Sequence, residues 1–262
     1  MIVAAIGSAS EPDRQASALF DAIVRKHQQP AEKYLVVTQP DHARLSGAFA
    51  AAIDRNRLPY VTDDVVAAIE MHDIGWLPID GAAPNPILPP YDLNGRLRSF
   101  ITTPPAVFIE GWTASIAHAE RISPAAGLMV SQHFEALARF RLRRTQDTLD
   151  DTAGLHHFLA QESARHIRLK RNADENASAD LLKLLQFCDV ISLYLCCGLE
   201  GDHEVAQDFG HGRVTIAGAK EGIRLTGVPL REPVRAQCPA FSWRPGSPTL
   251  LPHSIMVLAG AA

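Results

Sequence analysis

The spacing of apolar residues changes once along the chain, near residue 199, and this change limits the available folds. Before it, apolar residues recur with the period of an α-helix from about residue 10 onwards. After it, they alternate in short runs broken by Gly and Pro, at residues 214–216, 223–226, 234–238 and 254–258. Such alternation is typical of half-buried β-strands. The sequence therefore predicts a helical region followed by a small antiparallel sheet, and the β-like runs at residues 1–6 and 34–38 are candidates for the same sheet.

The composition is that of a globular protein. Hydrophobic residues make up 47% of the 262 residues, charged residues 21%, and the formal net charge is −4. These values exclude a disordered chain and give no reason to expect nucleic acid as a partner, so a small molecule is the expected ligand. The 4 cysteines show no C-x-x-C spacing, and three of them lie in an apolar helical run, which indicates a reducing compartment.

The most hydrophobic window, residues 181–199, contains Lys183, Gln186 and Asp189. These side chains would be costly at the centre of a bilayer, so no membrane span is expected. The apolar run at the N-terminus lacks the preceding basic residues of a signal peptide. We therefore expect a cytoplasmic protein that forms a single domain over residues 1–262.

A proline-rich stretch lies between Leu77 and Pro105. Its prolines cannot sustain a regular helix, so an ordered loop is expected. Long loops inside compact domains are often lids or binding elements. An insertion that only packs on the surface is the alternative.

Four helices can be placed from their local signals. The first begins at Thr38 and the second at Thr62, because each threonine is followed by an acidic first turn. The third begins at Ser123, where Pro124 occupies the first helical position. The fourth covers about residues 178–197, where residues at helical spacing share one face.

Each of these helices directs a histidine or an aspartate toward the expected core. They are His42 near the start of the first helix, His72 and Asp73 on the last turn of the second, His133 on the apolar stripe of the third, and Asp189 on the apolar face of the fourth. A buried carboxylate is costly without a positive partner, and one divalent cation would satisfy all of these side chains. Imidazole and carboxylate suit Fe, Mn, Zn or Ni. The alternative is a set of polar core residues that satisfy one another.

The order His42, His72-Asp73 and Asp189 resembles the H…HD…D pattern of the HD-domain superfamily of metal-dependent phosphohydrolases. The local strings TQPDH, HDIGW, VSQH and FCD resemble a bacterial branch of that superfamily without an assigned function. The resemblance covers roughly residues 34–200 and implies a mainly α fold, with an HD-like helical bundle as the core and residues 201–262 as a β-rich appendage. It implies that His42, His72, Asp73 and Asp189 hold a divalent ion (Fe, Mn, Zn, Ni or Mg), with His133 as a further ligand where two ions are bound.

The resemblance also implies a reaction, the metal-assisted hydrolysis of a phosphate ester. A bound ion would activate water, while Asp73 orients or deprotonates the nucleophile and His133 binds or protonates substrate oxygens. The candidates for phosphate contacts are Arg44, which follows His42 closely, and Arg96 and Arg98 in the proline-rich stretch.

The chain also departs from a well-defined subgroup of this superfamily. Cyclic-dinucleotide phosphodiesterases carry HDIGK followed by a Gly-Tyr-Pro element, whereas this chain has Trp76 after HDIG and no Gly-Tyr-Pro. That activity is therefore not expected. Two alternatives stay open: a di-iron oxygenase, which would need His118 as a further ligand, and a non-catalytic sensor or scaffold. Unpaired sheet edges would also suit a homo-oligomer.

Overall fold

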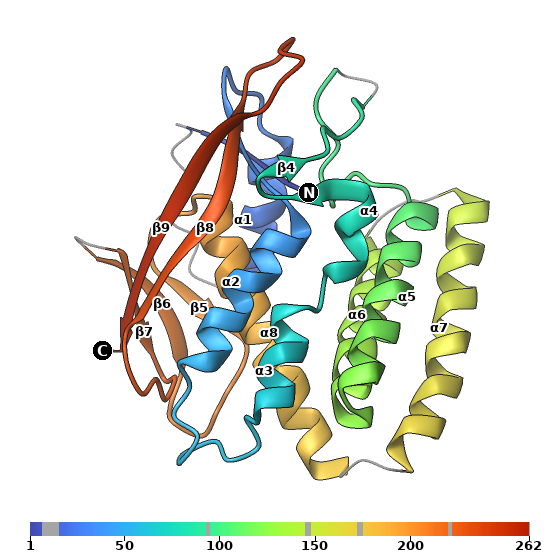
Figure 1. Cartoon of the computed structure of the whole chain (residues 1–262), viewed down its shortest axis with the longest axis vertical. Coiled ribbons are helices and arrows are strands. Elements are labelled where there is room, and N and C mark those ends of the chain that lie inside the picture. Colours follow the sequence, from blue (N-terminus) through green and yellow to red (C-terminus); the bar gives the residue numbers. More distant parts are fainter. Residues whose placement is uncertain (7–15, 93–94, 145–147, 172–174, 220–221, 262) are drawn as a thin grey trace.

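The computed structural model describes residues 1–6, 16–92, 95–144, 148–171, 175–219 and 222–261. Figure 1 shows a long, curved sheet on one side of the molecule and the helices stacked beside it. Within the described ranges, no helix combines the length and hydrophobicity needed to cross a membrane.

The large sheet contains 7 strands in the order β1-β2-β8-β9-β7-β6-β5. They are β1 (Ile2–Ala5), β2 (Tyr34–Val37), β5 (His203–Val205), β6 (Val214–Ala219), β7 (Gly222–Thr226), β8 (Val234–Trp243) and β9 (Leu251–Ala261). Neighbouring strands are antiparallel, except that β7 and β9 are parallel. The sheet is curled like half of a barrel. Consequently one helix, α1, contacts both of its edge strands, β1 and β5.

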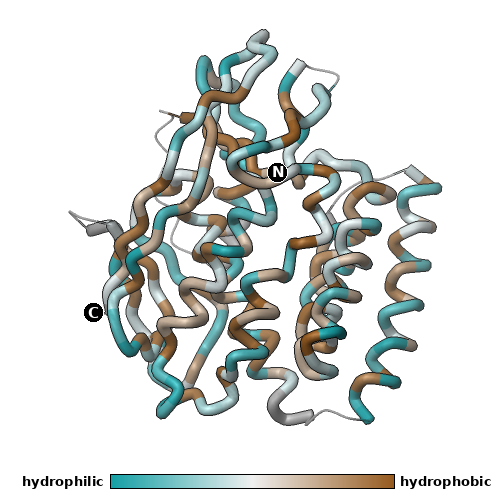
Figure 2. Tube along the Cα trace, in the orientation of Figure 1, coloured by the Kyte–Doolittle hydropathy of each residue, from teal (hydrophilic) through white to brown (hydrophobic). Residues whose placement is uncertain are grey.

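The helices fill the curl of the sheet and extend away from it. They are α1 (Ala16–Gln28), α2 (Gln39–Ala51), α3 (Asp63–Glu70), the 3₁₀ turn η1 (Ile74–Trp76), α4 (Leu77–Asp80), α5 (Pro105–Ile122), α6 (Pro124–Arg144), α7 (Leu149–Lys170) and α8 (Glu175–Cys196). Helix α2 packs on β8, α8 packs on α2 and α6, and α7 packs on α5 and α6. In Figure 1, α7 is the outermost helix, and in Figure 2 hydrophilic and hydrophobic residues alternate along it.

The capping signals in the sequence determine where two helices begin. The Thr38 hydroxyl accepts a hydrogen bond from the backbone N–H of Asp41 at the start of α2. The Thr62 hydroxyl accepts one from the N–H of Val65 at the start of α3. Both predicted helix starts are confirmed, because a threonine at this position satisfies an N–H that the helix itself leaves without a partner.

The sheet is covered on both faces near β1, β2 and the end of β8. On β2, Leu35 and Val37 belong with the main helix–sheet core, whereas Val36 belongs to a second, smaller core on the opposite face. That second core also contains Leu97 and packs against Leu88, both from the proline-rich stretch. This stretch, which includes α4 and the short strands β3 (Gly81–Ala82) and β4 (Asn85–Pro86), therefore covers the outer face of the sheet.

The expected fold class, a mainly α bundle with a small antiparallel sheet, is wrong. The sheet is large and mixed. The candidate strands near the N-terminus do join it, as β1 and β2. Strands β8 and β9 are 10 and 11 residues long, twice the length of the alternating runs in the sequence. The end of β8 is buried on both faces, so apolar residues do not alternate there, and Pro239 interrupts the pattern. The periodicity of the sequence therefore underestimates the lengths of β8 and β9.

Candidate metal centre

Side chains from four separate segments meet between the sheet-packed helices and the outer ones. His42 comes from α2, His72 and Asp73 from the turn between α3 and η1, His133 from α6 and Asp189 from α8. They form two overlapping groups, His42–His72–Asp73 and His72–His133–Asp189, and within each group the candidate ligand atoms lie within 4.8 Å of one another. His72 belongs to both groups.

The local backbone explains how two consecutive residues reach one centre. Helix α3 ends at Glu70, and Met71 is its cap residue, so His72 and Asp73 follow the helix instead of lying on its last turn as expected. Consecutive residues on a helix point about 100° apart. Outside the helix, Asp73 adopts φ −109° and ψ 19°, and its carboxylate turns toward the ring of His72.

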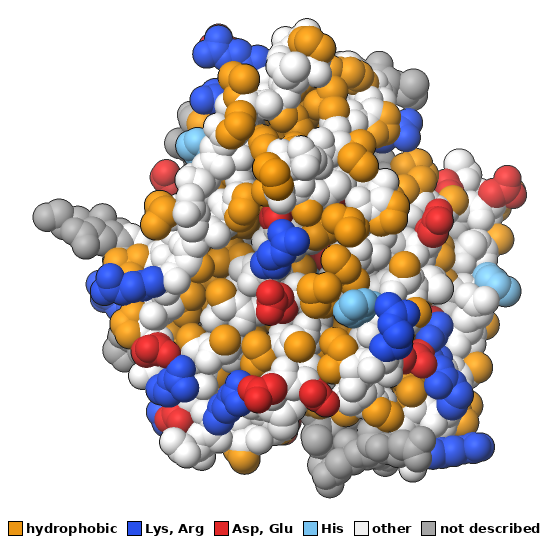
Figure 3. Space-filling view, viewed as in Figure 1, with side chains coloured by type: hydrophobic (Ala, Val, Ile, Leu, Met, Phe, Trp, Pro, Cys, Tyr) orange, Lys and Arg blue, Asp and Glu red, His pale blue; other side chains and the backbone are white. Residues whose placement is uncertain are grey.

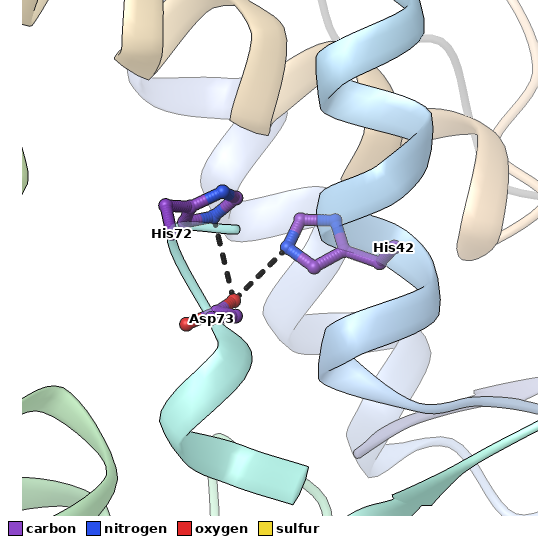
Figure 4. Close-up of side chains that lie close together, drawn as sticks. All are labelled: His42, His72 and Asp73. Carbon is purple, nitrogen blue, oxygen red and sulfur yellow. Dashed lines mark ion pairs between the residues drawn. The ribbon is translucent and has the colours of Figure 1, made fainter. Parts of the chain in front are cut away.

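The distances at the centre join two imidazoles to two carboxylates. His42 Nε2 lies 3.3 Å from Asp73 Oδ2 and 3.2 Å from Asp189 Oδ1. His72 Nε2 lies 3.4 Å from Asp73 Oδ2 and 3.5 Å from Asp189 Oδ1. Figure 4 shows the ring nitrogens of both histidines facing the Asp73 carboxylate. The two histidine side chains are buried, whereas the Asp189 side chain is 14% exposed.

Hydrogen bonds on the far side of the rings orient both histidines. His72 Nδ1 lies 2.8 Å from the carbonyl oxygen of Ile69. A carbonyl can only accept, so Nδ1 carries a proton, and Nε2 is the nitrogen that faces the carboxylates. That Nε2 has no hydrogen-bond partner although it is buried. His42 Nδ1 lies 2.5 Å from the hydroxyl of Ser192, which also occupies the far side of its ring.

The electrostatics show that this centre requires positive charge. Burial opposes a charge on His42, but the carboxylates of Asp189 and Asp73 outweigh it and raise its pKa to about 9. Burial also opposes a charge on His72, and the same carboxylates raise its pKa. For Asp189, burial is again outweighed, and His42 and His72 hold its pKa well below the usual range. Protons on the histidines therefore hold the carboxylates together when no cation does so.

His133 differs from the other two histidines. Burial lowers its pKa to about 4, so the ring is neutral at pH 7. Its Nε2 lies 3.9 Å from Asp189 Oδ2, its ring is 5.6 Å from that of His72, and its buried Nδ1 has no partner. It therefore offers one N–H and one lone pair at the edge of the centre.

The residues present fit a transition metal ion. Ligand atoms about 2.1 Å from a tetrahedral ion lie about 3.4 Å from one another. The nitrogen–oxygen separations across the four pairs of His42 and His72 with Asp73 and Asp189 are 3.2–3.5 Å. A cation at their centre would also occupy the buried, unpartnered Nε2 of His72. The structure thus contains buried histidine and aspartate groups that are able to bind a metal.

The raised pKa of His42 predicts how stability depends on pH when metal is removed. Because its pKa in the folded state, about 9, exceeds the ordinary 6.5, the protonated ring stabilises the fold fully below pH 6.5. This contribution, on the order of a few kcal/mol, is lost as pH rises toward 9. The Tm of wild-type protein, measured by thermal denaturation in chelator, should therefore fall between pH 6.5 and pH 9. The Tm of H42Q should fall less over the same range. A Tm that rises across the window would contradict this expectation.

The three arginines expected to contact phosphate have different positions. Arg44 lies on α2, ion-paired with the buried Asp41, and its side chain is 46% exposed. Arg96 donates from Nη1 to the carbonyl oxygen of Gln28 at 2.8 Å, and thus joins the loop to α1. Arg98 lies in the same loop, where its backbone N–H donates to the carbonyl of Pro90. Of the three, only Arg44 lies on an element that carries a histidine of the centre.

Two other residues singled out in the sequence lie outside both groups of candidate ligands. His118 is on α5, where its Nδ1 lies 3.1 Å from a guanidinium nitrogen of Arg121. Trp76, at the position of the lysine in HDIGK, is buried and belongs to the main core. Neither joins the candidate ligand groups found among the described residues.

Supporting contacts that the sequence did not reveal hold the ligand-bearing turn in place. Gly75 donates its backbone N–H to the Ser115 hydroxyl at 2.9 Å and lies directly against the carbonyl of Gly111. The start of α2 is held in a similar way, because Asp41 accepts from the N–H of Ala83 at 2.9 Å. The glycine in HDIG could have indicated such a contact, because glycine often marks a close approach of two backbones. Its partners, Gly111 and Ser115, lie far along the chain, so the sequence did not identify them.

Comparison with known proteins places the chain in a family without giving it an activity. A family model described as "Protein of unknown function (DUF3891)" matches residues 23–240, well over half of the chain. This range includes all of the candidate ligands. No curated protein and no solved structure matches the chain significantly.

Proposed function

The chain belongs to the DUF3891 family, whose description assigns no function, and we propose from the site itself that it is a metal-dependent hydrolase. One observation carries this proposal. The rings of His42 and His72 direct Nε2 at two carboxylates, Asp73 and Asp189, inside the protein, where only protons or a cation can balance the charge.

The ligand set favours a transition metal over Mg²⁺. His42, His72, Asp73 and Asp189 would hold the ion, and two imidazole nitrogens with two carboxylate oxygens suit Fe, Mn, Zn or Ni, whereas Mg²⁺ prefers oxygen alone. Such an ion, when bound, lowers the pKa of a coordinated water and polarises an oxygen of the substrate. The second group, His72, His133 and Asp189, shares His72 with the first, and a neutral imidazole has one lone pair, so only His133 and the other oxygen of Asp189 would be left for a second ion.

The remaining steps depend on side chains of this chain. Asp73 reaches the centre from a backbone turn, and its carboxylate can orient a water molecule or accept its proton. His133 is neutral at pH 7, so it would bind a substrate oxygen through its N–H and would not act as a general acid. Asp189 is the most exposed of the four ligands that would hold the ion, so the proposal has a small substrate approach from its side.

A phosphate ester is the substrate class that we propose, following the resemblance to HD-domain phosphohydrolases. Of the three arginines, only Arg44 lies on the helix of His42, and its half-exposed side chain is ion-paired with Asp41. Residues two apart on a helix point about 200° apart, so Arg44 does not face the centre and the choice of substrate class rests on the resemblance. Figure 3 shows basic and acidic side chains interspersed on the face seen in Figure 1. A mixed surface of this kind suits a small ester better than a long polyanion.

The first test of function is hydrolysis of p-nitrophenyl phosphate and bis(p-nitrophenyl) phosphate by protein loaded with Mn²⁺, Fe²⁺, Zn²⁺ or Ni²⁺. We expect chelator to remove the activity and added metal to restore it. H133Q should reduce turnover by about a hundredfold, the usual size of the effect of losing one positioned hydrogen-bond donor, while retaining the ion held by His42, His72, Asp73 and Asp189. H118Q is the matched control and should match wild type. Hydrolysis that persists at full rate in chelator would refute the proposal.

A further inference from the structure

A pair of buried hydroxyls lies behind the ring of His42. Ser192 is on α8, three residues after Asp189, and Ser46 is on α2, four residues after His42, so each lies about one helical turn beyond a candidate ligand. Both serines are fully buried, and their hydroxyl oxygens are 2.9 Å apart. They therefore connect the two helices that carry His42 and Asp189.

The bonds around Ser192 form a complete set. Its Oγ lies 2.5 Å from His42 Nδ1, 2.9 Å from Ser46 Oγ and 2.8 Å from the carbonyl oxygen of Asp189. The hydroxyl has one proton to donate and two lone pairs that accept. When it donates to the carbonyl, it accepts from the Ser46 hydroxyl and from the Nδ1–H of His42. In that arrangement Nδ1 of His42 carries a proton, so the lone pair of the neutral ring lies on Nε2.

The two histidines that face the carboxylates are thus oriented by different means. A backbone carbonyl of the adjoining helix, that of Ile69, binds Nδ1 of His72, and no side-chain substitution removes it. A side chain from another helix binds Nδ1 of His42, and the same side chain is bonded to the backbone of Asp189. One hydroxyl therefore influences both the ring orientation of His42 and its separation from Asp189.

We propose that Ser192 is a positioning residue of the metal centre, which holds the ring of His42 with its Nε2 lone pair toward Asp73 and Asp189. This inference rests on the proposed function, because it assumes that an ion binds there. Without the hydroxyl, the Nδ1–H of His42 is buried without an acceptor, or the ring adopts the other tautomer and its Nε2 lone pair is lost. Both outcomes weaken binding of an ion, and loss of such an outer partner typically costs 10–100-fold in affinity.

The test compares S192A with S46A, which removes the neighbouring hydroxyl of the same pair but leaves the partner of His42 Nδ1 in place. Affinity for Zn²⁺ and Co²⁺ is measured by competition with a chromophoric chelator, and the visible spectrum of bound Co²⁺ reports the ligand geometry. We expect S192A to bind the ion about 10–100-fold more weakly, with a changed Co²⁺ spectrum and unchanged stoichiometry at saturation. S46A should stay within a few fold of wild type, with an unchanged spectrum.

The outcomes separate this inference from the proposed function. Equal affinities and spectra for S192A and wild type would overturn the role of Ser192 while leaving the metal centre intact. Equal losses in S192A and S46A would also overturn it, since they would reflect packing between α2 and α8. A wild-type protein that takes up neither ion would refute the proposed function itself. Thermal denaturation of each metal-free variant confirms that it is folded.

Discussion

H72A is expected to bind almost no metal, whereas wild-type protein purified without chelator contains one or two equivalents. His72 belongs to both groups of candidate ligands, so its loss leaves neither group complete. It is also fully buried. Elemental analysis of the purified proteins provides the measurement.

Two companion variants make this result specific. D189A removes the carboxylate nearest to His42 and should lose metal to the same extent. H118A removes a histidine that is paired with Arg121 outside both groups, and should keep the wild-type content. If H72A retains a full equivalent, the ion is held elsewhere and the centre described here is not its site. The wild-type stoichiometry decides between one ion and two, and two ions would favour the oxygenase alternative.

G75A is expected to destabilise the protein more than any other small substitution at the centre. A Cβ at this position would lie 2.0 Å from the carbonyl oxygen of Gly111 and 2.7 Å from the backbone nitrogen of Ser115. These are backbone atoms of α5 and cannot rotate away, so η1 must move. Overpacking of this kind costs about 3 kcal/mol, which corresponds to a fall in Tm of roughly 6–12 °C for a chain of this size.

The displacement should also weaken metal binding, because η1 directly follows His72 and Asp73. G154A is the matched control, because it makes the same glycine-to-alanine change at a position with space for a Cβ. Gly154 lies inside α7, where an added Cβ would meet nothing closer than Ile109 Cδ1 at 3.8 Å. Alanine there should stabilise the helix by about 0.5–1 kcal/mol. Urea denaturation measures both variants, and a G75A protein as stable as wild type would contradict the close approach of η1 to α5.

Several local features of this chain follow from its sequence. Thr38 and Thr62 mark the starts of α2 and α3 because capping depends only on the next three residues. The alternating runs at residues 214–216 and 223–226 lie in strands β6 and β7 for the same reason, since alternation is a local property. Histidines and aspartates on apolar helix faces can likewise be recognised as candidate ligands, because burying them has a cost that requires a partner.

Other features depended on contacts between distant segments. The sequence did not indicate how long β8 and β9 are, because their lengths depend on pairing with each other and on burial of β8 from both sides. It also placed His72 and Asp73 on the last turn of a helix that in fact ends before them, at Glu70. The chain leaves the helix there, and its next turn, η1, packs against α5, a helix that starts about thirty residues later.

The sequence by itself determined which side chains are available for a metal centre: His42, His72, Asp73, His133 and Asp189, each on or beside a predicted helix. Only the tertiary structure decided that they meet within 4.8 Å in two groups and that Ser192 lies behind His42. It also showed that Arg96, a candidate for phosphate contacts, is bonded to α1. The physical reason is the distance along the chain over which each interaction acts. Capping and periodicity act over a few residues, whereas the positions of α2, α6 and α8 result from packing across the whole core, which no local pattern encodes.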